Sequence, residues 1–356
     1  MSHSFATDAQ SLNAQTLTQY LRGAGLLQDG IVSSVVAKII GTGKMGDNAR
    51  FELAYQGDQG QAPNTLIAKF PASDEHARAM AGAHGAYYNE VMFYRELAAG
   101  TTMRTPAIYG SELSEDHTEF LLLMEDMAPA EPGNNLVGET RARAETVLDE
   151  VAKLASAYYG NESLAERDYV VSAASDDGGE FGQSLMQQCW PGFLERFGAG
   201  LTPECIAFGD RYVDNVVRFV SQYEGPKTLV HGDLRSENLL FDGNVATTVD
   251  WQTISESSAV ADAAYFLGGS LEVEDRRQWE RELITRYHSN LVSAGVDMTF
   301  DSCWEQYRLY SMHGLMIIVL GASFSSSDER SDKMFLALIQ RHLQHCVDVN
   351  AGEFLE

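Results

Sequence analysis

The chain has 356 residues, 44% of them hydrophobic, so it is long enough for two lobes and apolar enough for a sizeable core. Asp and Glu total 51 against 25 Lys and Arg, which gives a formal net charge of -26. Such a surface repels phosphate backbones and anionic lipid heads, so we exclude nucleic acid and membrane surfaces as partners.

The four cysteines form no Cys-x-x-Cys pair, and we interpret them as free or buried thiols in a reducing compartment. The N-terminus lacks a basic region followed by an apolar one, so no signal peptide is expected. The longest apolar run, Leu315 to Phe324, is too short to span a bilayer and predicts a core helix. We therefore expect a cytoplasmic protein, and the sequence leaves its oligomeric state open.

Apolar periodicity predicts mostly strands in the first third of the chain. The expected elements are a helix at 11–27, a strand at 31–40, a glycine-rich turn at 41–48, strands at 51–55 and 65–70, a helix at 85–99 and a fully apolar strand at 120–124. Two prolines and a glycine within 125–133 then predict a connector between lobes.

Beyond the connector the pattern is mostly helical. The expected helices are 139–160, 182–197, 203–223, 258–270, 276–294, 302–323 and 331–348, with two short strands at 238–241 and 247–250. The sequence thus predicts an α+β fold with a β-rich lobe at 1–124, a hinge at 125–133 and a mainly helical lobe at 134–356.

The strongest chemical signal is an acid five residues before an amide, followed by an acid at the end of the next strand. These residues are Asp233, Asn238 and Asp250. Phosphoryl transfer from ATP needs such a set, because a carboxylate must accept the proton of the attacking hydroxyl and oxygen ligands must hold Mg²⁺ against the polyphosphate. Each residue alone could instead cap a helix, fill a turn or end a strand.

The run from His231 to Asn238, His-Gly-Asp-Leu-Arg-Ser-Glu-Asn, followed by Asp-Trp-Gln at 250–252, resembles the aminoglycoside phosphotransferase and choline kinase superfamily. It is most similar to the ecdysteroid-kinase-like (CHK-kinase-like) branch, which usually has Asp-Phe-Gln and often an aromatic residue at position 235. The resemblance implies a protein-kinase-like bilobal fold with ATP and Mg²⁺ in a cleft. It also implies that Asp233 is the catalytic base, that Asn238 and Asp250 bind the metal, and that His231 orders the catalytic loop.

Arg235 stands two positions after the expected base, where protein kinases place a lysine that contacts the transferred phosphate. A guanidinium suits phosphate geometry, so we assign Arg235 a catalytic role. The alternative is a solvent-exposed arginine.

Gly41, Gly43 and Gly46 match Gly-x-Gly-x-x-Gly, which dinucleotide-binding folds also carry. Because a strand rather than a helix is expected after them, we interpret the segment as a hairpin over the phosphates of ATP. No Lys-Ser or Lys-Thr follows Gly46, so the P-loop pattern fails. A plain hairpin turn is the alternative.

Lys69 lies within an otherwise apolar strand and Glu90 on the following helix. A buried lysine needs a partner, so we predict a Lys69–Glu90 pair that aims the ammonium at the nucleotide phosphates. The alternative is a lysine on the solvent face of an edge strand. Glu125 and Met127 resemble hinge positions whose backbone would bind adenine; the alternative is a plain strand end.

Asp262 begins an apolar helix, and by the resemblance it braces the catalytic loop; the alternative is a carboxylate favoured by the helix dipole. Only eleven residues separate Asp250 from Asp262, which leaves little room for a long peptide-docking segment and favours a small-molecule acceptor.

The sequence therefore predicts an ATP- and Mg²⁺-dependent kinase acting on a small-molecule hydroxyl. Aminoglycosides, choline-like alcohols, sugars, steroid-like alcohols and hydroxyamino acids all remain open as acceptors. One alternative is a catalytically silent nucleotide-binding protein of the same fold. The other, a dinucleotide-dependent oxidoreductase, is suggested only by the three glycines.

Overall fold

The computed structural model describes residues 5–41, 45–172, 176–325 and 328–356. The chain forms two compact units. The first comprises Met1–Gly100, Thr105–Pro129 and Val249–Thr253, and the second comprises Thr101–Arg104, Ala130–Thr248 and Ile254–Glu356. One is built on a small antiparallel sheet and the other is mainly helical, which confirms the predicted fold class. The hinge role of 125–133 stays a prediction.

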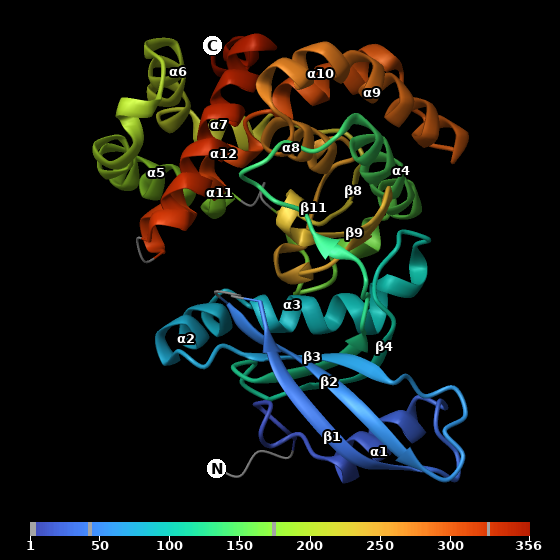
Figure 1. Ribbon diagram of the computed structural model, residues 1–356. Coiled ribbons are helices and arrows are strands. Elements are labelled where there is room, and N and C mark those ends of the chain that lie inside the picture. Colours follow the sequence, from blue (N-terminus) through green and yellow to red (C-terminus); the bar gives the residue numbers. More distant parts are fainter. Residues whose placement is uncertain (1–4, 42–44, 173–175, 326–327) are drawn as a thin grey trace. The chain divides into compact units, whose positions relative to one another are not determined.

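The described part of the first unit forms a five-stranded antiparallel sheet in the order β1-β2-β3-β5-β4 (Figure 1). Its strands are β1 (Ile31–Ile40), β2 (Gly46–Gln56), β3 (Thr65–Pro71), β4 (Ile108–Leu113) and β5 (Phe120–Glu125). Its helices are α1 (Ala14–Gly23), α2 (Glu75–Ala83) and α3 (Ala86–Met92), and α3 continues as a wider π-type turn over Phe93–Leu97.

Strand β5 is apolar from Phe120 to Met124 because both of its faces are covered. Leu121 and Leu123 belong to the cluster that contains Leu17 and Leu21 of α1, whereas Leu122 and Met124 belong to the cluster that contains α3. Successive side chains of a strand point to opposite faces, so the two helices lie on opposite sides of the sheet. The same alternation places Ile67 and Lys69 of β3 on the α3 side.

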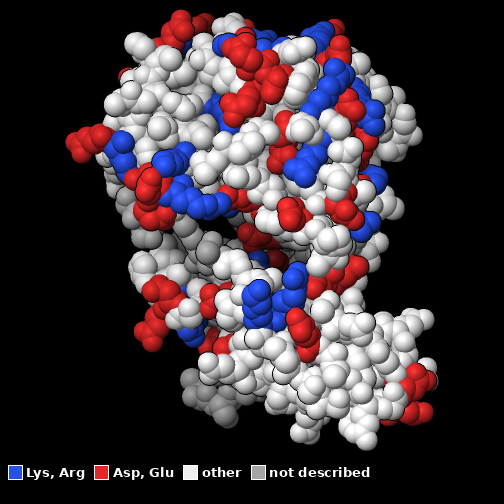
Figure 2. Space-filling view, viewed as in Figure 1, with Lys and Arg blue, Asp and Glu red and all other residues white. Residues whose placement is uncertain are grey.

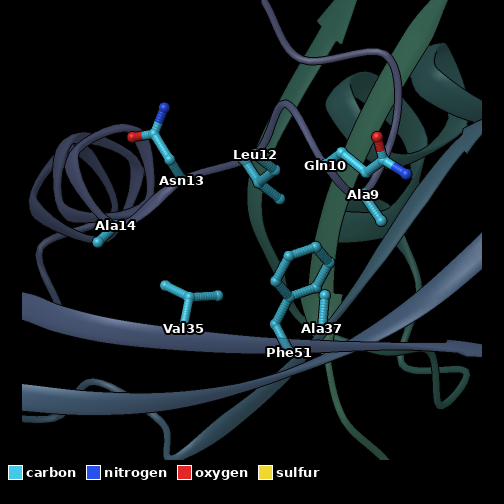
Figure 3. A pocket seen from close by; sticks show the side chains of 8 residues that line it. All are labelled: Ala9, Gln10, Leu12, Asn13, Ala14, Val35, Ala37 and Phe51. Carbon is cyan, nitrogen blue, oxygen red and sulfur yellow. The ribbon is translucent and has the colours of Figure 1, made fainter.

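A shallow hollow of about 350 Å³ lies on the α1 side of this sheet (Figure 3). It is bounded by the segment before α1 and by Val35, Ala37 and Phe51 of β1 and β2, and its polar side chains are Gln10 and Asn13. Asn13 already accepts a hydrogen bond from the backbone N–H of Thr16 and caps α1. With no ionisable side chain in its lining, this hollow offers nothing for phosphate chemistry.

The second unit packs its helices around one large apolar core. Its helices are α4 (Arg141–Tyr158), α5 (Asp176–Phe197), α6 (Pro203–Val213), α7 (Val216–Ser221), α8 (Ala261–Ser270), α9 (Val273–Ser293), α10 (Phe300–Tyr310), α11 (His313–Phe324) and α12 (Glu329–Asp348). Two small sheets, ordered β10-β9-β6 and β7-β11-β8, complete it. Their strands are β6 (Glu131–Pro132), β7 (Val171–Ser172), β8 (Lys227–Val230), β9 (Leu239–Asp242), β10 (Val245–Thr248) and β11 (Ser255–Ser258).

The apolar run at 315–324 lies in α11, where Leu315, Ile318 and Val319 are buried in this core, so the predicted core helix is confirmed. Among the helices that the structure describes, none is both long enough and apolar enough to cross a membrane. On the face shown in Figure 2, acidic side chains gather in several small groups with Lys and Arg between them, so the excess of acids forms no single continuous patch there.

Candidate functional site

Lys69 makes the central ionic contact of the first unit. Its ammonium donates to both oxygens of Glu90, at 2.9 and 2.7 Å, and to Oδ1 of Asp250, at 2.7 Å. The Lys69 side chain is 9% exposed and that of Glu90 is 1% exposed, whereas that of Asp250 is 37% exposed. The predicted Lys69–Glu90 contact is therefore present, and Asp250 joins it.

Electrostatics keep this lysine charged. Burial by itself would lower the pKa of Lys69, but the carboxylates of Asp250 and Glu90 outweigh it and hold that pKa above its ordinary value. Burial raises the pKa of Glu90, and the contact with Lys69 opposes that rise. Lys69 is therefore a cation throughout the neutral pH range.

Each residue of the Asp-Trp-Gln segment has its own contact in the first unit. Asp250 lies in the left-handed region, φ 69°, which short polar side chains tolerate best after glycine. Trp251 stacks on Phe93, with ring centroids 3.7 Å apart and planes 6° apart. Gln252 donates from Nε2 to Oε2 of Glu90 at 3.2 Å. The aromatic stack therefore anchors the segment while Asp250 and Gln252 contact the ion pair.

The catalytic-loop motif brings three predicted residues together in the second unit. Asn238 donates from Nδ2 to the backbone oxygen of Asp233 at 2.8 Å and to its Oδ2 at 3.1 Å. Arg235 donates from Nε to the same Oδ2 at 3.1 Å and from Nη1 to Glu237 at 3.1 Å. The loop lies between β8 and β9, and its tight turn uses Gly232 at a φ of 85°.

Asp262 holds the backbone of this loop. It is buried at the start of α8 and accepts from the N–H of His231 at 2.7 Å and from that of Gly232 at 3.0 Å. The N–H of Asp233 faces Nδ1 of His231 at 3.3 Å. Three consecutive backbone donors thus have side-chain acceptors, which fixes the path of the loop before the expected base.

We expect Asp262→Ala to lower the free energy of unfolding by about 2–5 kcal/mol, because two buried N–H groups lose a charged acceptor. Asp301→Ala is the matched control, since Asp301 also lies in the first turn of a helix, α10, but is exposed. If only the helix dipole mattered, both variants would lose about 0.3–1 kcal/mol. Urea unfolding of the two variants distinguishes these outcomes.

The glycine-rich segment joins two antiparallel strands. Ile40 of β1 pairs with Asn48 of β2, so a strand follows the glycines where a dinucleotide site needs a helix. Gly41 has a φ of 72°, and a Cβ on Gly46 would lie 2.9 Å from the backbone oxygen of Phe70. Gly43 lies outside the described residues.

Of the two expected hinge positions, Glu125 already uses its backbone N–H, which donates to the oxygen of Ala107 at 2.8 Å. The N–H of Met127 has no acceptor among the described residues. Asp126 between them is held by Arg50 at 2.8 Å. Met127 is therefore the better placed of the two to donate to a ligand.

The structure thus brings Lys69, Glu90 and Asp250 together in the first unit, and Asp233, Arg235 and Asn238 together in the second. That both sets act on one magnesium ion stays a prediction. Sequence reasoning missed Gln252, although it belongs to the quoted Asp-Trp-Gln motif. It also missed Tyr265, which donates to Asp233 at 2.8 Å and carries no motif signal beyond lying one helical turn after Asp262.

Comparison with known proteins shows the family and the fold. The model of the ecdysteroid kinase-like family matches residues 45–299, which is more than half of the chain. A search of curated proteins gives no significant match.

Solved structures share the fold at low sequence identity. Choline kinase from Cryptosporidium parvum has a TM-score of 0.55 at 10% identity, over 96% of this chain and 97% of that chain. The complex of gentamicin with APH(2")-IIa has a TM-score of 0.52 at 14% identity, over 95% and 96% of the two chains. The streptomycin–ATP ternary complex of APH(2")-IIa has a TM-score of 0.50 at 13% identity, over 93% and 99%. These matches establish a kinase-like fold, and the family match confirms the resemblance seen in the motifs.

Proposed function

Because the chain belongs to the ecdysteroid kinase-like family, we propose that it is a small-molecule kinase that transfers the γ-phosphate of ATP to a hydroxyl group with the help of Mg²⁺. The observation that carries the proposal is the contact of Lys69 with both Glu90 and Asp250. Placing a lysine inside a sheet is costly, and two carboxylates offset that cost while keeping the ammonium charged. Phosphoryl transfer uses such a cation at the nucleotide phosphates.

We assign nucleotide binding to residues of the first unit. Lys69 keeps its contact with Glu90 and donates to phosphate oxygens, the glycine turn at Gly41, Gly43 and Gly46 covers the phosphates, and the N–H of Met127 donates to adenine. The ATP complex of APH(2")-IIa, which has the same fold, supports ATP as the donor.

The donor set fits a hard divalent cation. Mg²⁺, when bound, neutralises charge that develops on the phosphate oxygens, and it prefers oxygen ligands. Asp250 offers a half-exposed carboxylate. Asn238 contacts Asp233 through its amide nitrogen. Its Oδ1 receives no hydrogen bond from the described residues and is open to a metal. These two side chains would hold the metal.

Asp233 is the proposed base that accepts the proton of the attacking hydroxyl. Arg235 is bonded to Asp233 and Glu237, and burial opposes its charge while the Asp233 carboxylate raises its pKa above the ordinary value. A guanidinium so placed keeps N–H groups for the transferred phosphate, which is the role we propose for it.

We propose a small-molecule acceptor. The short stretch between Asp250 and Asp262 contains β11, which pairs along its full length with β8 and over two residues with β7, so little of its edge is open to a peptide. A choline kinase and APH(2")-IIa in complex with gentamicin share the fold, and both choline and gentamicin are small molecules. A panel of amino alcohols, sugars, aminoglycosides and sterols, assayed for Mg²⁺-dependent ADP release, tests the proposal. Mg²⁺-ATP binding without turnover across the panel would instead indicate a silent nucleotide-binding protein.

We expect Asp250→Asn to lower the Mg²⁺-dependent part of ATP affinity by at least about tenfold, because the metal loses its carboxylate ligand. Calorimetric titration with ATP at several magnesium concentrations measures the effect. The control is Asp242→Asn, which changes an exposed acid at the end of β9. Its ATP affinity should match that of the wild type at every magnesium concentration. Equal ATP affinity of Asp250→Asn and wild type across the magnesium series would refute the ligand role.

A further inference from the structure

The carboxylate of Asp233 is held by three side chains rather than two. Its Oδ2 accepts from Arg235 Nε and from Asn238 Nδ2, both at 3.1 Å. Its Oδ1 accepts from the hydroxyl of Tyr265 at 2.8 Å. The first two donors belong to the catalytic loop itself, whereas Tyr265 comes from helix α8, 32 residues further along the chain.

Hydrogen-bond capacity then distinguishes the two oxygens. A carboxylate oxygen has two lone-pair sites, so Oδ2 is filled by Arg235 and Asn238. Among the described residues, Oδ1 has Tyr265 as its one donor and keeps one site open. The oxygen that Tyr265 contacts is therefore the one able to accept a proton from a substrate hydroxyl.

The ring of Tyr265 is fixed on two sides. It stacks on His342 of α12, with centroids 5.1 Å apart and planes 19° apart, and meets His313 of α11 edge-on at 5.5 Å. His313 also contacts the backbone oxygen of Gly232 through Nε2, at 3.0 Å. A Cβ on Gly314 would lie 2.6 Å from His342, so the close approach of this histidine needs glycine at that position.

The side chains of Tyr265 and His342 are both uncharged at neutral pH. Burial and then the charge of Asp233 raise the pKa of Tyr265 well above its ordinary value. Burial lowers the pKa of His342 to about 3. A neutral phenol beside an ionised carboxylate donates its proton to the hydrogen bond and does not compete for the substrate proton.

Helix α8 thus presents two groups to the catalytic loop. Asp262 and Tyr265 are three residues apart, so they share one face of the helix. Asp262 binds the loop backbone at His231 and Gly232, and Tyr265 binds the side chain of Asp233. One rigid element therefore fixes both the position of the loop and the rotation of the carboxylate.

We propose that Tyr265 is a positioning residue, which orients Oδ1 of Asp233 toward the acceptor hydroxyl. This inference rests on the proposed function, since it assigns a role in the same reaction. It predicts that the hydroxyl of Tyr265 acts through Asp233 alone and adds nothing to nucleotide binding.

The test compares Tyr265→Phe with wild type in the slow Mg²⁺-dependent hydrolysis of ATP, in which water takes the place of the acceptor. We expect kcat to fall about 10- to 100-fold, as loss of one hydrogen bond to a charged group implies, with KM for ATP within about twofold. In an Asp233→Asn background the same change should have no further effect, because the group it orients is gone. A full additional loss in that background would overturn the proposal.

Tyr287→Phe is the matched control. Tyr287 is also fully buried in the second unit, and its hydroxyl donates to the backbone oxygen of Ala259 rather than to the loop. Its variant should lose stability without losing kcat. If both phenylalanine variants lower kcat equally, Tyr265 is merely structural.

A crystal structure of Tyr265→Phe shows the orientation of the Asp233 carboxylate directly, without any measurement of activity. We expect the Asp233 carboxylate to rotate or to occupy two orientations, whereas an unchanged carboxylate would overturn the inference. Wild type that binds no Mg²⁺-ATP and releases no ADP would defeat the proposed function instead, and the comparison of the two crystal structures would still decide whether Tyr265 orients the Asp233 carboxylate.

Discussion

Asp233→Asn is expected to slow phosphoryl transfer by about two to four orders of magnitude while Mg²⁺-ATP still binds. An amide cannot accept the hydroxyl proton, so the reaction loses its base. The variant is well suited to the site, because an amide oxygen can still accept from Arg235 and Asn238 while its nitrogen donates to the hydroxyl oxygen of Tyr265. That arrangement keeps the loop folded and places a donor where the acceptor hydroxyl needs an oxygen.

Single-turnover transfer to the best acceptor of the panel measures the rate of phosphoryl transfer. Calorimetric titration measures Mg²⁺-ATP binding. Asp149→Asn is the control, because Asp149 makes its contacts with Arg286 and Asn290, away from the catalytic loop. Wild-type turnover in Asp233→Asn would show that another group takes the proton.

Lys69→Met is expected to lose both stability and nucleotide affinity. Among the described residues, the change leaves the buried Glu90 with Gln252 as its side-chain donor, and removal of one partner from a buried pair costs about 3–5 kcal/mol of unfolding free energy. It also removes the cation that we propose binds the phosphates. Urea unfolding and calorimetric ATP titration measure the two effects separately.

The double variant Lys69→Met/Glu90→Gln separates stability from function. A neutral glutamine no longer carries an unpaired charge, so most of the lost unfolding free energy should return, whereas ATP affinity should not. Recovery of ATP affinity along with stability would mean that Lys69 serves the fold alone. Wild-type stability of the single variant would contradict the burial argument.

Strands and helices with strong apolar periodicity were predictable. Strand β1 runs over residues 31–40 as expected, and the apolar run near residue 320 is a core helix. The predicted 302–323 helix was wrong in its continuity, because α10 ends at Tyr310 and α11 begins at His313. Ser311 between them turns its hydroxyl back to the carbonyl of Arg308, a contact that periodicity does not register.

The predicted helix at 203–223 was also wrong in its continuity. It is divided between Val213 and Val216, where Asn215 donates from its side chain to the carbonyl of Arg211. Helix α2 and strand β4 were missed. The first is rich in alanine and buries little, and the second, with Gly110 and Ser111, is a half-buried edge strand without alternation.

The sequence by itself determined the family, the α+β fold class and the contact between Asp233 and Asn238 within one loop. These follow from local order along the chain: Asp233 and Asn238 lie in one short loop, so their contact is set by the loop itself. Tertiary structure alone decided which distant side chains complete each set. Gln252 reaches Glu90 across 162 positions and Tyr265 reaches Asp233 across 32, and such hydrogen bonds depend on how sheet and helices pack, which no spacing in the sequence encodes.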